Sequence, residues 1–468
     1  MATSVFTAFN RSMKSAAIAL GAMGLMATAT PAAAQSLIRD AEIEQTLRAY
    51  ATPVWRAAGL EPNDIHVFIV QDPSINAYVA GGQNIFVHTG LIMAAKTPNE
   101  IIGVLAHETG HIAGGHLARN REAIHQAMFP MLISIGLGVL AIAAGAPQAG
   151  SALIAGSQQF AMSNFVQYTQ VQEAAADQAG LTFLEDSGQS GRGLISFFDD
   201  NLRPYEFMAR RMPPYMQTHP YTSDRVEALR QRVEAADHRD AVDTPDNISR
   251  LRFMQAKLVG FIQNEGQTLS RYPTSDTSQP ARYARAVAYY RVSDLPHARA
   301  ELDSLIHESP NNPYFQELMG QILFENGRAA EAIPYHRRSL QLAPNEPLLQ
   351  INLARDLTAA NGRAGTDEAI DLLQRSLARE PDNAYAWREI AQARDLRGEE
   401  GLAELASAEQ SFAMRDYGTA LNFAERARRT LPHNTPSYQR AMDIVTFAGN
   451  EVRDQAPQQQ QRGGRRGG

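Results

Sequence analysis

A repeat of 34 residues in the C-terminal half constrains the fold of this chain more than any other feature of its sequence. Pro310 and Pro344 are 34 residues apart, and each follows a segment of helical periodicity and precedes an Asn. Small residues recur at the same distances before the two prolines: Ala286, Ala298, Gly320, Ala332 and Ser339. Tetratricopeptide repeats have this period and need small residues where their two helices touch. We therefore expect a solenoid of paired helices.

The later prolines extend this pattern to about four and a half repeats. Pro381 lies 37 residues after Pro344, and the three additional residues fit in a loop at 361–366. Pro432 lies 51 residues further on, which is the length of one repeat plus one helix. Stacked helix pairs form a concave groove, so the pattern favours protein or peptide binding. A rigid spacer is the alternative interpretation.

Composition excludes several classes of protein. The chain of 468 residues is longer than one typical domain, and its hydrophobic content of 44% is that of a globular protein. A formal net charge of −7 provides no basic field for nucleic acid, so we expect no nucleic-acid partner. The chain has no Cys, which excludes disulfides, thiolate metal sites and iron–sulfur clusters. Any metal ion must therefore be held by His, Asp or Glu.

Residues 1–34 have the pattern of an export signal. Basic residues precede an apolar run at 16–27, and Ala32 and Ala34 flank an expected cleavage site. The apolar run is too short to cross a bilayer, which argues against a permanent anchor. The bacterial style of the signal indicates the periplasm as the compartment.

The front half contains a metal-binding motif on a predicted helix. Thr97 and Pro98 are typical of a helix start, and an apolar run then leads into His107-Glu108-Thr109-Gly110-His111. Residues four apart stand on one face of a helix, so His107 and His111 can bind one ion. Glu108 points about 100° away from His107, which suits a general base that acts on a water molecule beside the metal.

A catalytic zinc ion needs a third protein ligand, and two candidates compete. His116 lies nine residues after His107, on the wrong side of the helix unless the helix breaks at Gly114 and Gly115. Glu173, in the sequence Glu173-Ala174-Ala175-Ala176-Asp177, is favoured as a ligand from a second helix. Asp177, one turn later, can hydrogen-bond the outer nitrogen of a ligand histidine. The intervening alanines allow two helices to approach closely.

These features predict a mainly α chain of two domains. We expect a gluzincin-like α/β metalloprotease domain with a small sheet at 35–245, followed by an all-α tetratricopeptide solenoid at 246–454. The tail at 455–468 is rich in Gln, Gly and Arg, so we expect it to be disordered.

Several motifs together resemble the zinc metallopeptidase family that includes HtpX and the CAAX prenyl proteases. They are HETGH at 107–111, EAAAD at 173–177, Asn76-Ala77-Tyr78, Gly81-Gly82, and His219-Pro220 followed by Arg225. With its export signal and its repeat half, the chain is most similar to the periplasmic BepA-type members, over nearly the whole mature length. The resemblance implies one zinc ion per chain and an enzyme that degrades misassembled outer-membrane proteins and assists their assembly. The implied partners are unfolded or stalled β-barrel proteins and their assembly machinery.

The resemblance also implies roles for further residues. An edge strand formed by Asn76, Ala77, Tyr78 and Val79 would pair with extended substrate, and the sequence itself predicts strands at 76–79 and 85–88 around a glycine turn. His219 would serve either as a removable fourth zinc ligand that keeps the enzyme idle or as a contact for the oxyanion. Arg225 would stabilise transition-state charge or maintain the architecture of the site.

An apolar segment separates the two parts of the metal motif. No Asp, Glu, Lys or Arg occurs from 123 to 172, and residues 127–146 are about long enough to cross a bilayer. A single crossing would place His107 and His111 on the opposite side from Glu173, so we reject it. A flap over the cleft, a peripheral membrane contact through 127–146 and a plain buried helix stay open.

Two rival functions stand beside the periplasmic zinc endopeptidase. The first is a chaperone or adaptor that acts through the solenoid groove and has a vestigial metal site. The second is a scaffold whose metal site is permanently filled by His219.

Overall fold

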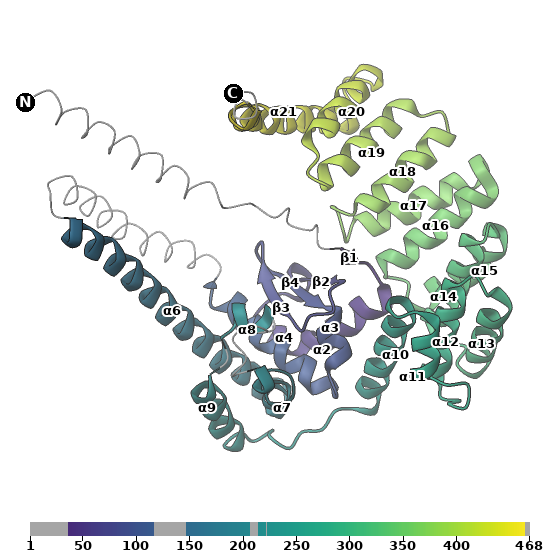
Figure 1. Cartoon of the computed structure of the whole chain (residues 1–468). Helices are drawn as coiled ribbons and strands as arrows, with labels where there is room; N and C mark the ends of the chain where they lie inside the picture. Colours follow the sequence, from purple (N-terminus) through teal and green to yellow (C-terminus); the bar gives the residue numbers. More distant parts are fainter. Residues whose placement is uncertain (1–35, 117–146, 206–213, 221, 464–468) are drawn as a thin grey trace, which may run out of the picture.

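The computed structural model describes residues 36–116, 147–205, 214–220 and 222–463 (Figure 1). Within them the fold is mainly helical, with one small sheet and a solenoid of helices, which confirms the expected fold class. The segment expected to be an export signal, at 1–34, and the apolar segment at 127–146 lie outside the described residues. Among the described helices, none combines the length and the apolar character needed to cross a bilayer.

The sheet has four strands in the order β1-β2-β4-β3. The strands are β1 (Leu37–Ile38), β2 (His66–Val70), β3 (Ala77–Ala80) and β4 (Asn84–His88). β2 and β4 are parallel, whereas β3 is antiparallel to β4, with Ala77 opposite Val87. Gly81 and Gly82 adopt φ angles of +63° and +105°, which L side chains rarely adopt, and this turn joins β3 to β4. The expected hairpin is present, and β3 forms an edge of the sheet.

Helices pack against the sheet and build the rest of the front domain. They are α2 (Ala41–Ala57), α3 (Thr89–Ala94), α4 (Pro98–Ala113), α6 (Pro147–Asp186), α7 (Arg192–Asn201), α8 (Pro214–Thr218) and α9 (Ser223–Glu234), with short 3-10 turns η1 (Pro62–Asp64) and η2 (Arg203–Tyr205). Helix α4 begins as its sequence predicts, because the Thr97 hydroxyl accepts a hydrogen bond from the backbone N–H of Glu100. Its apolar residues, such as Ile101 and Val104, are buried in the main core of this domain.

Small residues allow α4 and α6 to cross in close contact. A Cβ added to Gly110 of α4 would lie 2.5 Å from the Ala176 carbonyl oxygen of α6. A Cβ added to Gly180 of α6 would lie 3.0 Å from the Ala106 carbonyl oxygen of α4. The backbone distance therefore leaves no room for a side chain at Gly110 and little at Gly180, and it brings the second half of the metal motif up to the first.

The C-terminal half is a curved stack of antiparallel helices (Figure 1). Its elements are α10 (Pro245–Ile262), α11 (Glu265–Arg271), α12 (Gln279–Arg291), α13 (Leu295–Glu308), α14 (Pro313–Glu325), α15 (Ala329–Leu342), α16 (Pro347–Asn361), η3 (Gly362–Gly365), α17 (Thr366–Leu377), α18 (Ala384–Leu396), α19 (Glu400–Ala413), α20 (Tyr417–Thr430) and α21 (Pro436–Gly463). The helix starts repeatedly carry Pro in the first turn, where its missing N–H is not needed.

The small residues of the repeat lie at helix contacts, as their spacing predicts. Ala286, Ala298, Ala332 and Ser339 are fully buried. A Cβ added to Gly320 would lie 2.5 Å from the imidazole of His336, so only glycine fits there. The three additional residues of the third repeat lie at η3, in the loop where the sequence places them.

Helix α10 belongs to both halves of the molecule. Leu251, Met254 and Leu258 are part of the front core, and the same helix packs against α12. The Tyr50 hydroxyl of α2 donates a 2.7 Å hydrogen bond to the Asn247 carbonyl. The expected boundary at 245/246 thus falls at the start of a helix that joins the two domains.

Helix α21 extends into the segment for which we expect disorder. The structure continues α21 through Gly463, whereas the sequence led us to expect disorder from residue 455. Gln and Ala are good helix formers, and adding residues to an existing helix avoids the cost of nucleation. Residues 464–468 lie outside the described residues.

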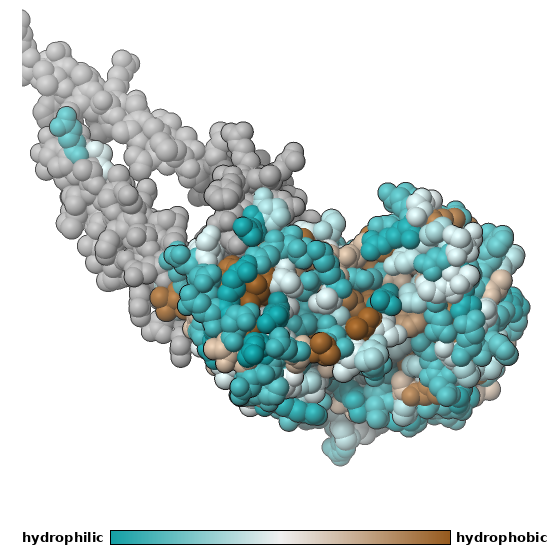
Figure 2. All heavy atoms as spheres, turned by 90° about the horizontal axis from the view of Figure 1, so that it is seen from below, coloured by the Kyte–Doolittle hydropathy of each residue, from teal (hydrophilic) through white to brown (hydrophobic). Residues whose placement is uncertain are grey.

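The face shown in Figure 2 is mostly hydrophilic, with small separate hydrophobic spots. Among the described residues, the exposed large hydrophobic side chains come from separate elements: Leu37, Val171, Val242, Val292, Leu396, Met414 and Phe447.

Candidate metal centre

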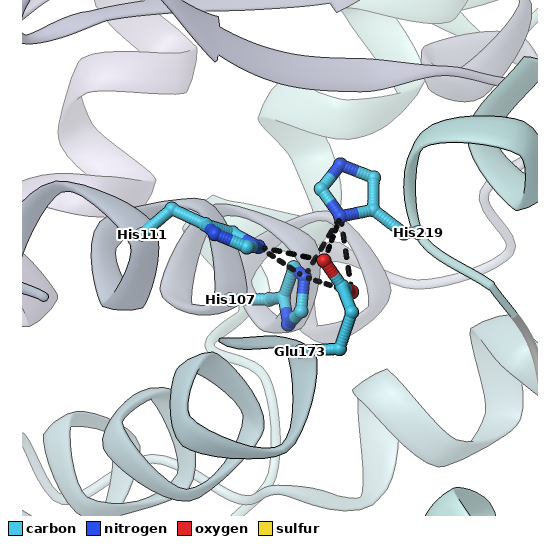
Figure 3. A group of neighbouring side chains, drawn as sticks. All are labelled: His107, His111, Glu173 and His219. Atoms are coloured by element: carbon cyan, nitrogen blue, oxygen red, sulfur yellow. Dashed lines mark hydrogen bonds and ion pairs between the residues drawn. The ribbon is translucent and has the colours of Figure 1, made fainter. Parts of the chain in front are cut away.

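Four side chains from three parts of the front domain converge on one point (Figure 3). His107 and His111 come from α4, Glu173 comes from α6, and His219 follows the short helix α8. One potential ligand atom from each of them lies within 4.8 Å of all the others. The structure thus brings together the predicted pair of histidines, the favoured third ligand and His219, which the resemblance implied as a possible fourth ligand.

The distances between these atoms fit a tetrahedral zinc site. His107 Nε2 lies 3.1 Å from His111 Nε2 and 3.4 Å from Glu173 Oε2. His219 Nδ1 lies 3.3 Å from His107 Nε2 and 3.1 Å from Glu173 Oε1. A tetrahedron with arms of about 2.0–2.1 Å has edges of about 3.3–3.4 Å, so the donors already stand at the required separation. Imidazole and carboxylate are donors that zinc accepts.

The outer nitrogen of His107 is held by a carboxylate. His107 Nδ1 lies 2.8 Å from Asp177 Oδ1, one helical turn after Glu173, which is the position that the sequence gives to this partner. Burial lowers the pKa of His107, but Asp177 and Glu173 outweigh it and raise the pKa to about 10. Binding of a metal ion would therefore release a proton from His107. Burial raises the pKa of Glu173, but the surrounding histidines more than reverse this effect.

Arg225 connects three parts of the site. Thr222 caps α9 and places Arg225 in its first turn. The guanidinium contacts Asp177 through Nε at 2.5 Å and Nη2 at 2.9 Å, while Nη1 lies 3.1 Å from Glu173 Oε2. Nη1 also donates a 2.8 Å hydrogen bond to the Pro220 carbonyl, next to His219. Of the two expected roles for Arg225, these contacts favour the architectural one.

The carboxylate of Glu108 is fully buried beside the cluster. Its two oxygens have no hydrogen-bond partner within the described residues, and Oε1 lies 3.5 Å from His219 Nε2. A buried carboxylate that accepts no hydrogen bond destabilises the folded state. Such groups are common where a side chain must act on substrate or water.

His116 reaches the site but not the ligand cluster. Helix α4 ends at Ala113 with Gly114 as its C-cap, and Gly115 adopts a φ of +62°, so the chain turns there. His116 Nδ1 then lies 2.9 Å from His111 Nδ1, the nitrogen that faces away from the cluster. The helix break that His116 would need in order to be a metal ligand is therefore present. The cluster nevertheless contains Glu173 and not His116.

Two further features surround the cluster. Tyr215, which the sequence gave no reason to single out, is buried with its ring centroid 4.7 Å from that of His219. The predicted substrate strand lies in β3, which contacts α4 and α8. Tyr78 stacks on Phe86 of β4 at 5.1 Å, and Asn76 precedes the strand with its side-chain oxygen buried.

Comparison with known proteins identifies the family of this part of the chain. Residues 37–233 match the model of peptidase family M48, and this range contains every residue of the cluster. This part of the chain is a peptidase family M48 domain. The M48 domain makes the chain a metalloprotease, as the resemblance implied.

Relatives extend the similarity beyond the M48 domain. The beta-barrel assembly-enhancing protease of Yersinia pestis is 26% identical over 389 residues, which cover 82% of this chain and 78% of the relative. The protein of the same name from Escherichia coli K12 is 26% identical over 82% of this chain and 77% of its own. The metalloprotease LoiP of E. coli K12 is 27% identical, over 42% of this chain and 73% of LoiP.

Proposed function

We propose that this M48 metalloprotease is a zinc-dependent endopeptidase of the periplasm that degrades misassembled outer-membrane proteins and assists their assembly. The observation that carries the enzymatic part is the convergence of His107, His111 and Glu173 beside the buried carboxylate of Glu108, which accepts no hydrogen bond from the described residues. One zinc ion per chain, held by these three ligands, would polarise a water molecule and the substrate carbonyl.

Glu108 is the proposed general base and acid. Its carboxylate is buried and accepts no hydrogen bond from the described residues, so it is available to take a proton from the attacking water. The same carboxyl group then delivers a proton to the leaving amine. Its place on α4, next to His107, fixes its position relative to the ligands.

Substrate is proposed to lie extended along β3. This strand is at an edge of the sheet, so its free backbone groups can pair with one more strand. Asn76, Ala77, Tyr78 and Val79 would form this contact. Because β3 contacts α4 and α8, an added strand would run past the metal site.

His219 is the proposed latch. Catalytic zinc sites use three protein ligands and keep one position open, whereas His219 supplies a fourth donor here. His107 and His111 are each held at their outer nitrogen by Asp177 and His116. The outer nitrogen of His219 makes no hydrogen bond within the described residues. Such a ligand is the easiest of the three imidazoles to displace, and once displaced it can contact the oxyanion.

The biological part of the proposal rests on the relatives and on the solenoid. The similarity to beta-barrel assembly-enhancing proteases covers both halves of the chain, and the solenoid offers a surface for unfolded barrel proteins or their assembly machinery. The second candidate function is a chaperone or adaptor that acts through this groove. The fourth donor, His219, favours it, since a latched protease would spend much of its time without cleaving.

The test is Glu108→Gln in the full chain. We expect cleavage of casein or of an unfolded outer-membrane protein to fall by at least about 100-fold, because the general base is lost, while zinc content and melting temperature stay close to wild type. Glu100→Gln is the matched control, because it removes another buried carboxylate from α4 at a distance from the ligands. Undiminished cleavage by Glu108→Gln would contradict the proposed base, and wild-type protein without zinc would contradict the metal site.

A further inference from the structure

The two histidines of α4 have their outer nitrogens held by different partners. His107 Nδ1 faces the carboxylate of Asp177, which is the familiar arrangement behind a metal-binding histidine. His111 Nδ1 faces another imidazole instead, at 2.9 Å from His116 Nδ1. His116 is only 5% exposed, so this contact is made away from bulk water.

The backbone after α4 is built to bring His116 to this position. Gly115 takes a left-handed φ of +62°, which turns the chain back over the last turn of the helix. The ring of His116 then lies against Gly114, where an added Cβ would be 2.4 Å from Nε2 and 2.8 Å from Cδ2. Gly115 therefore provides the turn, and Gly114 provides the space for the imidazole.

We infer that His116 is a positioning residue that fixes the orientation and tautomer of His111 for metal binding. A hydrogen bond between two Nδ1 atoms needs one proton. If His111 carries it, the lone pair of His111 Nε2 points into the cluster, as a ligand requires. His116 then accepts at Nδ1 and carries its own proton on Nε2. A neutral imidazole orients His111 without adding a negative charge beside Glu173.

This inference rests on the proposed zinc site and is tested by metal affinity. The experiment compares His116→Asn with His116→Leu in the full chain, and measures the zinc dissociation constant by competition with a chromophoric chelator. The side-chain oxygen of Asn occupies nearly the same place as Nδ1 of His and accepts the same hydrogen bond, whereas Leu fills a similar volume with no acceptor. We expect His116→Leu to weaken zinc binding by about 10- to 100-fold and His116→Asn by about threefold or less.

A second variant reaches the same contact from the backbone. Gly114→Ala leaves both imidazoles in the sequence but places a methyl group against the ring of His116. We expect it to weaken zinc binding in the same direction as His116→Leu. The visible spectrum of the cobalt-substituted protein should change in both variants, since it reports the geometry around the ligands.

The outcomes separate this inference from the function on which it rests. If wild type binds zinc and His116→Leu binds it equally well, His116 only fills space and the inference is wrong. The same holds if Asn weakens binding as much as Leu does. If wild type and all variants fail to bind zinc, the proposed function fails with it.

Discussion

At the scale of single residues, His219 is the side chain that we propose to hold the enzyme in an idle state. Its Nδ1 completes a set of four donors, and its Nε2 lies 3.5 Å from Glu108. In the proposed latch, this one imidazole would occupy the fourth metal position and also lie beside the proposed general base.

His219→Ala should raise proteolysis of an unfolded substrate by about tenfold, which corresponds to about 1.4 kcal/mol in the activation barrier. The reason is that removal of the fourth donor leaves three ligands and room for water. The rate of cleavage at saturating zinc is the measurement.

His336→Ala is the matched control for this prediction. His336 is a buried histidine of the solenoid, with Nδ1 2.6 Å from Asp356. Its loss should lower the melting temperature without raising proteolysis. An equal rise in both variants would show that loosening of the fold, rather than loss of a latch, exposes the activity.

At the scale of elements, the crossing of α4 and α6 positions the metal ligands. Gly110 and Ala176 set the separation of the two helices, and Glu173 lies less than one turn before Ala176. The glycine inside the metal motif therefore serves helix packing rather than chemistry.

Gly110→Ala should lower the free energy of unfolding by about 1–3 kcal/mol, because a methyl group has no space at 2.5 Å from a backbone oxygen. It should also weaken zinc binding, since the helices must separate. Thermal unfolding and chelator competition measure the two effects. Gly266→Ala, in an exposed turn of α11 with no atom nearer than 3.6 Å, should instead be neutral or slightly stabilising. If Gly110→Ala changed neither the free energy of unfolding nor the zinc affinity, the contact between α4 and α6 would have to be looser than the structure shows.

At the scale of the whole molecule, a buried charge network joins the M48 domain to the solenoid. Lys257 of α10 is 1% exposed, and its Nζ lies 2.8 Å from Asp40, 3.4 Å from Glu42 and 3.6 Å from Glu317. The Tyr283 hydroxyl donates a 2.8 Å hydrogen bond to Glu42. One cation thus compensates carboxylates from both halves.

Lys257→Met should lower the free energy of unfolding by about 3–5 kcal/mol, because it leaves these carboxylates buried without a counter-charge. Chemical denaturation is the measurement. Lys96→Met is the control, because Lys96 is 65% exposed and pairs with Asp200 at the surface, where loss of an ion pair costs little. A small effect at Lys257 would show that the carboxylates are protonated or hydrated.

The carboxyl group of Glu346 predicts that the stability of the protein depends on pH. Burial, together with the charges of Glu44 and Glu380, raises the pKa of Glu346 to about 7. The folded state therefore holds this proton more tightly than the unfolded chain does. The stability that Glu346 contributes is present in full below the unfolded pKa of this group and is lost as the pH rises through 7.

Glu346→Gln should remove this loss. The variant and wild type should have similar melting temperatures near pH 4.5, and the variant should be more stable at pH 8. Glu380→Gln tests the assignment from the neighbouring charge, since it should lower the pKa of Glu346 and weaken its pH dependence. An advantage of Glu346→Gln that does not grow with pH would contradict this account.

The sequence by itself determined the local elements and the ligands they carry. The spacing of His107 and His111, the cap at Thr97 and the period of the small solenoid residues depend on contacts within one or two helical turns or on a repeated unit. Such patterns are visible along the chain, and the structure contains the predicted elements.

Only the tertiary structure decided how distant groups meet. His116 is near the ligands in sequence, yet the turn at Gly115 sends it to the back of His111. Arg225 and Lys257 find partners from separate elements, and His219 reaches the cluster from a loop. Local periodicity indicates which face of a helix packs against a neighbour, but it does not indicate which side chains from separate elements meet there.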